Sequence, residues 1–142
     1  MKLRIIIDKE REEEILIYAH ERTDLIRSIE KLIAPSDELT AYSETDAVKL
    51  TDDDIFCFIS ENGNTYAITQ AEKLKVRLRL YQLEERLGNN FIRLNQSCIG
   101  NVSKMKRFES GFSGSLTVVF KNGYKDYVSR RQLKAVKERL GI

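Results

Sequence analysis

The sequence predicts an α+β fold that is mainly β, with a few helices. Short apolar runs are bounded by turn-forming residues, such as the Asn-Gly pair within residues 61–64 and the KNG turn at 121–123. Apolar residues at helical spacing occur near residues 23–34, 80–87 and 129–141. The length of 142 residues fits one compact domain with an appendage, or two very small domains.

The start of the chain predicts a small β-β-α unit. Residues 2–8 and 14–20 are two Ile-rich runs of strand length, and the polar residues between them suit a turn. Thr23 is the expected N-cap of a helix that runs to about Ala34, because apolar residues recur on one face until Pro35 stops it. So small a unit buries little core alone, and we expect it to dock on the second domain or to pair with another copy.

A linker-like stretch, residues 36–46, follows this unit. We therefore predict two domains, residues 1–43 and residues 44–142. In the second domain, alternating apolar residues and turn signals predict strands at residues 48–50, 55–60, 65–69, 74–80, 91–95, 102–109, 116–120 and 125–128.

Two helices complete the second domain. The first covers residues 80–87, where the apolar spacing changes from strand-like to helical, and Gly88 is expected to close it. The second begins after Ser129 as N-cap, with Gln132 at the capping-box position, and ends at Gly141.

The composition argues against an enzyme. His20 is the one histidine, and the sequence contains no Gly-rich phosphate loop, CxxC pair or nucleophile elbow. We therefore expect no catalysis, no cofactor and no small-molecule substrate. The acidic residues 52–54 suit a solvated turn better than a cation site. No apolar run reaches the roughly 18 residues of a membrane helix, so the expected location is cytoplasmic, and Cys57 and Cys98 are expected to be buried free thiols.

Basic residues concentrate towards the end of the chain. Residues 91–142 hold eleven Lys and Arg against three acids, a balance of +8, whereas residues 1–90 hold thirteen against nineteen, a balance of −6. This asymmetry suits a surface that binds a polyanion. Asn95 and Gln96 in one turn add amide groups of the kind that bind base edges bidentately. Duplex DNA is the predicted partner, and a protein-interaction module or an RNA-binding domain that uses the same basic face stays open as an alternative.

The predicted N-cap gives two arginines a particular position. Arg130 and Arg131 fall in the first turn of the last helix, where exposed backbone N–H groups suit a phosphate but a cation opposes the helix dipole. A DNA phosphate or a guanine edge would explain them. A salt bridge to Glu109 or Asp126 is the structural alternative.

The same stretch resembles the LytTR-type DNA-binding domain of bacterial transcription regulators. Residues 91–97, FIRLNQS, resemble the family's F-x-R-x-x-x-S strand and turn, and Asn101 follows where the family has Val-Asn. Residues 121–124, KNGY, and residues 128–131, VSRR, resemble its late hairpin and the V-S-R signature before its last helix.

The resemblance covers residues 44–142 and includes the acidic-apolar run at 52–59. It departs from the family at Gly100, where an aliphatic residue is usual. It implies an elongated β-sheet DNA-binding domain in which loops, and not a recognition helix, enter successive major grooves.

The resemblance also implies which residues contact DNA. Gln96 and Arg131 are expected at base edges, and Asn62 or Asn64 in the neighbouring groove. The expected phosphate contacts are Arg93, Lys104 and Ser129. The full set of expected DNA-binding residues is Asn62, Asn64, Arg93, Asn95, Gln96, Ser97, Lys104, Ser129, Arg130 and Arg131.

Each of these roles has a structural alternative. Asn95 and Gln96 would then bond only their own turn, and Asn62 would serve the hairpin. Asn101 is interpreted as a structural residue that satisfies turn backbone. Six aromatic residues at strand spacing suit either a stacking platform for single strands or, more often, a core.

Many members of the family follow a phosphorylatable receiver domain, which the 43 residues ahead of this domain are too few to form. The chain resembles instead the members that stand alone beside a membrane protein thought to hold them in check. The predicted partners are therefore double-stranded DNA, a second copy in a homodimer, and an inhibitory membrane protein. The N-terminal unit is the expected place for either protein partner.

Overall fold

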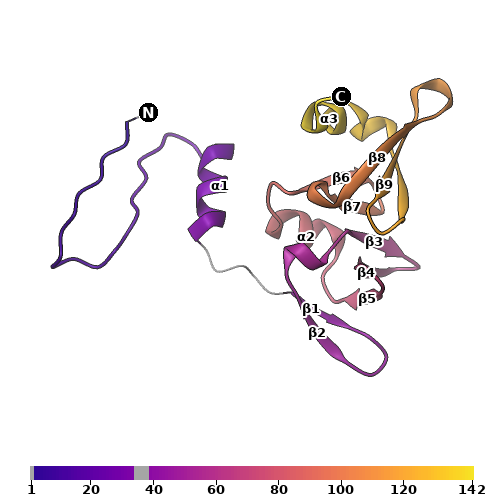
Figure 1. Cartoon of the computed structure of the whole chain (residues 1–142), viewed down its shortest axis with the longest axis horizontal. Helices are drawn as coiled ribbons and strands as arrows, with labels where there is room; N and C mark the ends of the chain where they lie inside the picture. The colour runs from indigo at the N-terminus through magenta and orange to yellow at the C-terminus, as the bar shows by residue number, and fades with distance from the viewer. Residues whose placement is uncertain (1, 34–38) are drawn as a thin grey trace.

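The structure is a computed structural model, and it describes residues 2–33 and 39–142. Three α-helices and ten strands lie in these ranges (Figure 1). In chain order they are α1 (Asp24–Ile33), β1 (Leu39–Tyr42), β2 (Ala47–Leu50), β3 (Cys57–Glu61), β4 (Asn64–Ile68), β5 (Lys73–Val76), α2 (Leu80–Arg86), β6 (Phe91–Asn95), β7 (Cys98–Asn101), β8 (Met105–Ser110), β9 (Leu116–Phe120), β10 (Lys125–Val128) and α3 (Arg130–Leu140). The predicted α+β class is confirmed.

The strands form two antiparallel sheets. Seven strands pair in the order β2-β1-β5-β4-β3-β7-β6, and three pair in the order β10-β9-β8. In Figure 1, α3 lies at the top near β6, and the β1–β2 hairpin projects at the bottom. The larger sheet is therefore long and narrow, as the resemblance implied.

Alternation along β3 divides the buried residues between two cores. Cys57 and Ile59 face a core that the three-stranded sheet and Val136 of α3 complete, whereas Phe58 faces a second core that includes Leu83 of α2. The larger sheet is therefore covered on both faces, which explains why the run at 55–59 is apolar throughout. Cys57 and Cys98 are buried and free, as predicted.

Strand β7 was missed, and the strand predicted at 102–109 begins later, at Met105. The Asn101 side chain explains the break between the two strands. Its Nδ2 donates to the carbonyls of Asp52 and Ile55 at 3.1 and 2.8 Å, and its Oδ1 accepts from the Ser103 backbone at 3.1 Å, so the chain turns there. The structural role predicted for Asn101 is confirmed.

Gly100 in β7 lies against core side chains. A Cβ at this position would lie 2.9 Å from Met105 Cε, 3.0 Å from Phe120 Cζ and 3.1 Å from Leu94 Cδ1. The space that an aliphatic residue would occupy is therefore filled by the ends of these three side chains.

The N-terminal unit differs from its prediction. Helix α1 forms, and Thr23 Oγ1 accepts from the Ile26 backbone at 3.4 Å, but residues 2–8 and 14–20 run extended and pair with no strand among the described residues. The two predicted strands are therefore wrong for the single chain, because a strand requires a hydrogen-bonded neighbour. Residues 2–20, which we call the N-terminal arm, have no such neighbour among the described residues. The predicted helix end at Ala34 lies outside the described residues.

The linker predicted at 36–46 was wrong in its second part. Residues 39–42 form β1, which pairs with β2 along its length and with β5 at Tyr42, and the turn between β1 and β2 is closed by Ser43 and Asp46. The polar sequence of this hairpin resembles a linker because it is an exposed sheet edge. A boundary at residue 43 would divide the hairpin, and the division into two domains otherwise stays a prediction.

The last helix begins and ends where predicted. Ser129 has extended backbone angles at the N-cap, but its side chain makes no capping bond, so the capping box with Gln132 does not form. Gly141 ends the helix with a φ of 70°, in the left-handed region that glycine adopts readily. None of the described helices is long and apolar enough to cross a membrane.

Candidate nucleic-acid interface

Three segments that are distant in the sequence meet at one end of the seven-stranded sheet. They are the β3–β4 turn, the β6–β7 turn and the start of α3. The Ser60 backbone donates to the Ser97 carbonyl at 2.9 Å, which joins the first two segments. The Ser129 backbone donates to the Leu94 carbonyl at 2.9 Å, which joins the second to the third. We call this end the three-segment edge and define it by Asn62, Asn64, Gln96, Ser97, Ser129, Arg130 and Arg131.

Asn95 holds the edge together from inside. It is 1% exposed, and its Nδ2 donates to Asp126 Oδ1 at 2.9 Å and to the Tyr127 carbonyl at 2.8 Å. Its Oδ1 accepts from the Ser97 backbone at 2.8 Å. Asn95 therefore connects the β6–β7 turn to β10, and its side chain is too buried to contact DNA. Its predicted place among the contacting residues does not fit this burial, and the alternative, bonding within its own turn, does.

Arg93 supports the same turn. Its Nε donates to the Asn95 carbonyl at 2.8 Å, its Nη2 donates to the Gln96 carbonyl at 2.8 Å, and its Nη1 lies 3.1 Å from Glu84 Oε2 on α2. The side chain is 20% exposed. All three guanidinium nitrogens therefore have partners within the chain, so the predicted phosphate contact would require some of these bonds to be shared or lost.

The exposed groups of the edge are different. Gln96, Ser97, Arg130 and Arg131 are exposed, and no described residue forms an ion pair with either arginine. The alternative of a salt bridge to Glu109 or Asp126 is not observed, because both acids have other partners.

Those partners are specific. Glu109 Oε1 lies 3.0 Å from Arg107 Nη2 and 3.6 Å from Lys125 Nζ. Asp126 Oδ1 accepts from Asn95, and its Oδ2 accepts from the Tyr124 hydroxyl at 3.0 Å. The arginines at the start of α3 are therefore exposed cations at a helix N-terminus, an unfavourable position that a bound anion would relieve.

The β3–β4 turn carries the predicted Asn62 amide and, beside it, a guanidinium that the sequence analysis missed. Asn62 and Gly63 have φ angles of 50° and 78°, as in the tight turn predicted from Asn-Gly. Arg79, the residue before α2, donates from Nη1 to the Gly63 carbonyl and so lies against this turn. Its position depends on the β4–β5 pairing, so no local sequence signal could have revealed it.

Lys104 lies at the opposite end of the sheet. It follows β7, and its carbonyl accepts from the Lys121 backbone at 2.9 Å, next to the turn in which Asn122 donates to the Thr69 carbonyl. Its Nζ lies 5.5 Å from the centre of the Phe56 ring. The structure therefore does not bring Lys104 together with the three-segment edge.

Two titratable groups behind the edge, the Tyr124 hydroxyl and the Cys98 thiol, are shifted towards their neutral forms. Burial and the neighbouring Asp126 carboxylate raise the pKa of the Tyr124 hydroxyl far above its usual value. A hydrogen bond with Cys57, together with burial, raises the pKa of the Cys98 thiol. Both groups therefore stay protonated at neutral pH, and the charge that DNA would meet is that of the exposed arginines.

Most of the aromatic residues belong to the cores. Phe120 is fully buried, Phe108 and Tyr124 pack against the same core, and Phe91 lies 5.8 Å from Phe58 between ring centres. Phe112 and Tyr127 are the exceptions among these six, at 98% and 58% exposed. The described aromatics therefore favour the core over a stacking platform for single strands.

A comparison with protein-family models identifies the same region. Residues 46–141 match the family described as LytTr DNA-binding domain. The chain belongs to the LytTr DNA-binding domain family. The predicted family and its DNA-binding class are thus confirmed, and this class is not one of enzymes.

Similar proteins extend the match beyond this LytTr domain. An uncharacterized HTH-type transcriptional regulator of Staphylococcus aureus strain MSSA476 is 35% identical over 146 residues, covering 100% of this chain and 99% of the relative. A regulator of the same description from strain NCTC 8325 / PS 47 is 34% identical over the same length. The N-terminal unit is therefore shared with these relatives.

A solved structure shows the same fold. The LytTr DNA-binding domain of a Bacillus cereus protein described as a methyl-accepting/DNA response regulator matches with a TM-score of 0.72 at 19% identity, covering 77% of this chain and all of that one. In the present LytTr chain, strands separate each described helix from the next along the sequence. The described helices therefore include no consecutive pair of the helix-turn-helix kind named for the Staphylococcus relatives.

Proposed function

We propose that this LytTr protein is a sequence-specific transcription regulator that binds double-stranded DNA through turns and the start of a helix. The observation that carries the proposal is the composition of the three-segment edge. Exposed amides from two turns lie there beside Arg130 and Arg131, which have no ion-pair partner among the described residues.

The roles within the edge follow from the chemistry of each side chain. Gln96 and Arg131 are exposed and can bind base edges bidentately in a major groove. Asn62 and Asn64 lie in the neighbouring hairpin and would meet the adjacent groove. Arg130 and the backbone around Ser129 suit phosphates, and Arg79 adds a guanidinium beside the β3–β4 turn. We assign Asn95 and Arg93 to holding the turn, since their polar groups are bonded within the chain.

The charge distribution supports the same proposal. The balance of +8 in residues 91–142 supplies attraction that does not depend on base sequence, and each neutralised phosphate releases counterions. DNA binding would therefore weaken steeply with salt. An interaction module would lack this dependence on duplex DNA, and an RNA-binding domain would be competed by structured RNA.

A selection from a random double-stranded DNA pool, at about 150 mM salt, tests the proposal. The wild-type protein is expected to enrich a motif of two repeated half-sites. The Gln96→Ala/Arg131→Ala double variant should lose the motif while remaining folded. The Lys134→Ala/Lys137→Ala variant is the matched control, because it removes two exposed cations from the same helix away from the edge. Failure of the folded wild-type protein to enrich any motif would contradict the proposal.

We extend the proposal to the setting in which the protein works. Repeated half-sites call for two copies, so the protein would act as a homodimer, and DNA as partner places it in the bacterial cytoplasm. We expect no catalytic activity. Control by an inhibitory membrane protein stays a prediction.

A further inference from the structure

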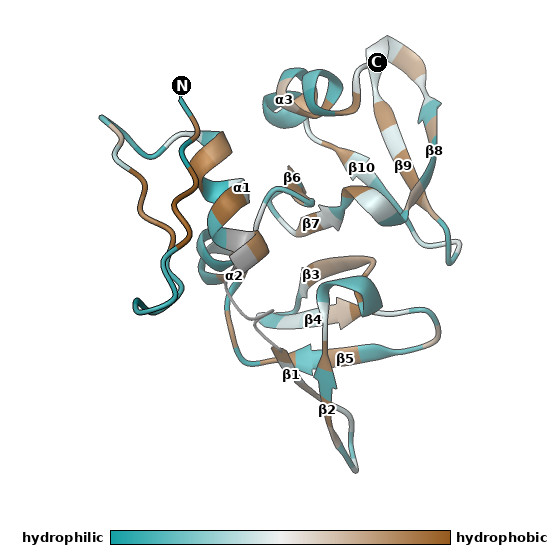
Figure 2. Cartoon of the chain, turned by 60° about the vertical axis from the view of Figure 1, so that its left-hand side comes forward, coloured by the Kyte–Doolittle hydropathy of each residue, from teal (hydrophilic) through white to brown (hydrophobic). Residues whose placement is uncertain are grey.

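The first twenty residues leave large apolar side chains uncovered. Ile5, Ile7, Leu16 and Tyr18 are 78%, 88%, 65% and 94% exposed. Figure 2 shows the two extended segments as hydrophobic strips beside α1, away from the sheets. Contiguous exposed apolar surface of this kind marks an interaction site in a soluble protein.

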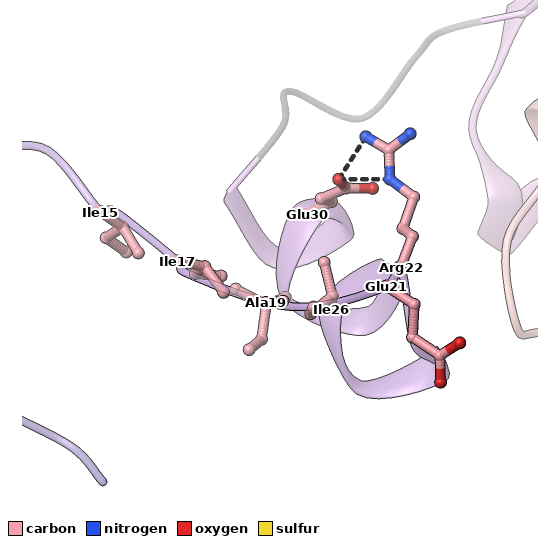
Figure 3. A pocket seen from close by; sticks show the side chains of 8 residues that line it. Ile15, Ile17, Ala19, Glu21, Arg22, Ile26 and Glu30 are labelled. Atoms are coloured by element: carbon pink, nitrogen blue, oxygen red, sulfur yellow. Dashed lines mark hydrogen bonds and ion pairs between the residues drawn. The ribbon is translucent and has the colours of Figure 1, made fainter. Parts of the chain in front are cut away.

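This surface includes a groove. Ile15, Ile17 and Ala19 of the second segment and Ile26 of α1 line an open space of about 750 Å³ (Figure 3), which Ile29 of α1 also lines. At one side, Arg22 Nη2 lies 2.6 Å from Glu30 Oε1. The groove is thus apolar along its length, with a charged border.

The backbone in this region also lacks partners. Residues 2–8 and 14–20 make no backbone hydrogen bonds to one another or to any other described residue. The N–H and C=O groups of an extended segment form a template for another strand. Each segment offers seven residues of such backbone.

Charge favours a segment from a second copy over the chain's own first segment as the occupant of the groove. A hairpin within one chain must be antiparallel, and around the intervening residues 9–13 it would place Asp8 opposite Glu14, a like-charge pair that destabilises a sheet. Residues 2–8 of another copy can instead run parallel to residues 14–20. Lys2 would then lie opposite Glu14, and Leu3, Ile5 and Ile7 would still face the groove.

We infer that a second copy of this chain covers the groove, with residues 2–8 of each copy paired along residues 14–20 of the other. The exchange is reciprocal, so both segments of both copies gain partners in one closed two-fold interface. The inference rests on the proposal that the protein acts as a dimer, and it locates the contact in the N-terminal arm and not in the DNA-binding domain.

Cross-linking of full-length variants tests the exchange directly. Ile5 and Ile17 would lie opposite each other in either strand direction, so a disulfide between these positions would report which chain supplies the partner. Ile5→Cys and Ile17→Cys proteins with tags of different mass would be mixed and oxidised mildly. A covalent heterodimer joined between positions 5 and 17, well above the level from Ile5→Cys mixed with the exposed control Tyr81→Cys, would support the inference. Absence of the heterodimer would overturn it. In the Ile5→Cys/Ile17→Cys double variant, a 5–17 disulfide formed only within single chains would also overturn it.

Sedimentation of the protein without DNA gives an independent measurement. The wild type should dimerise at micromolar concentration, and Ile17→Glu should raise the dimer dissociation constant roughly 30-fold or more, as loss of a central interface contact does. Tyr81→Glu, on α2, should have no effect. A monomer at every concentration, or equal effects of the two substitutions, would overturn the inference. Binding to a single half-site should survive Ile17→Glu, so failure here is distinct from failure of the DNA-binding proposal.

Discussion

The β6–β7 turn contains two neighbouring amides with opposite surroundings. Asn95 is buried and makes three hydrogen bonds, to Asp126, Tyr127 and Ser97, whereas the Gln96 side chain is exposed. The arginines repeat the contrast, since Arg93 binds the carbonyls of the turn and Arg131 has no ion-pair partner among the described residues. A support layer therefore lies beneath a contact layer built from the same chemical groups. This comparison teaches that residue type alone does not identify a DNA contact.

The largest expected effect lies in the support layer. Asn95→Ala removes three hydrogen bonds of a buried side chain, each worth about 1 kcal/mol, so the free energy of unfolding should fall by about 3 kcal/mol. Urea denaturation measures it. Gln96→Ala, the matched control one residue away, should change stability by less than about 0.5 kcal/mol. Equal effects of the two substitutions would remove the distinction between the layers.

In the contact layer, Arg131→Ala should cost about 1–3 kcal/mol of binding free energy on the selected site and less on unrelated duplex. The cause is loss of a base contact with the fold intact. Titration of labelled DNA at fixed salt measures both affinities. Lys137→Ala removes one charge from the same helix and should weaken both equally. If Arg131→Ala also weakened both equally, Arg131 would be a phosphate contact.

Arg93 tests whether the support layer acts on DNA through the turn. Arg93→Lys keeps the charge but cannot bond both turn carbonyls in one plane, so stability should fall by about 1 kcal/mol and specific affinity should fall with it. Thermal unfolding and DNA titration measure the two effects. Arg107→Lys, the control, alters an exposed ion pair with Glu109 and should change neither the stability nor the DNA affinity. Lower affinity with unchanged stability would instead indicate that Arg93 contacts DNA itself.

The smallest effect is expected at the thiols behind the edge. Because the pKa of Cys98 is raised and both cysteines are buried, iodoacetamide at pH 8 should leave the native protein unmodified. Both thiols should react in urea. Mass spectrometry counts the additions, and rapid labelling of the native protein would mean that the support layer opens.

Local signals predicted the parts of the fold that local chemistry determines. Thr23 lies at the start of α1 and Gly141 at the end of α3, as their residue types indicate, and Asn62-Gly63 forms the expected tight turn. Pairing with distant strands was harder to foresee. The edge hairpin at 39–50 looked like a linker because its exposed side chains are polar, and β7 was hidden by Gly100 and Asn101.

The candidate site also has parts that the sequence could predict and parts that it could not. The three segments that meet were named from the family resemblance, and their turn residues and arginines also leave local signals. The division between Arg93 and Arg131 could not be predicted, since it depends on which carbonyls lie within reach. In the N-terminal arm, the Ile-rich runs are typical of strands, and both segments are extended. A strand also needs a paired neighbour, and the single chain supplies none among the described residues.

Gly100 has a consequence for how sequences of this fold can change. Because the ends of Leu94, Met105 and Phe120 occupy the place of a side chain at position 100, that position is coupled to its neighbours. An aliphatic residue introduced alone would overpack the core, and the same residue together with a smaller one at 105 would restore the volume. Substitutions at 100 and 105 should therefore appear together across the family's history, as covarying pairs and not as independent changes.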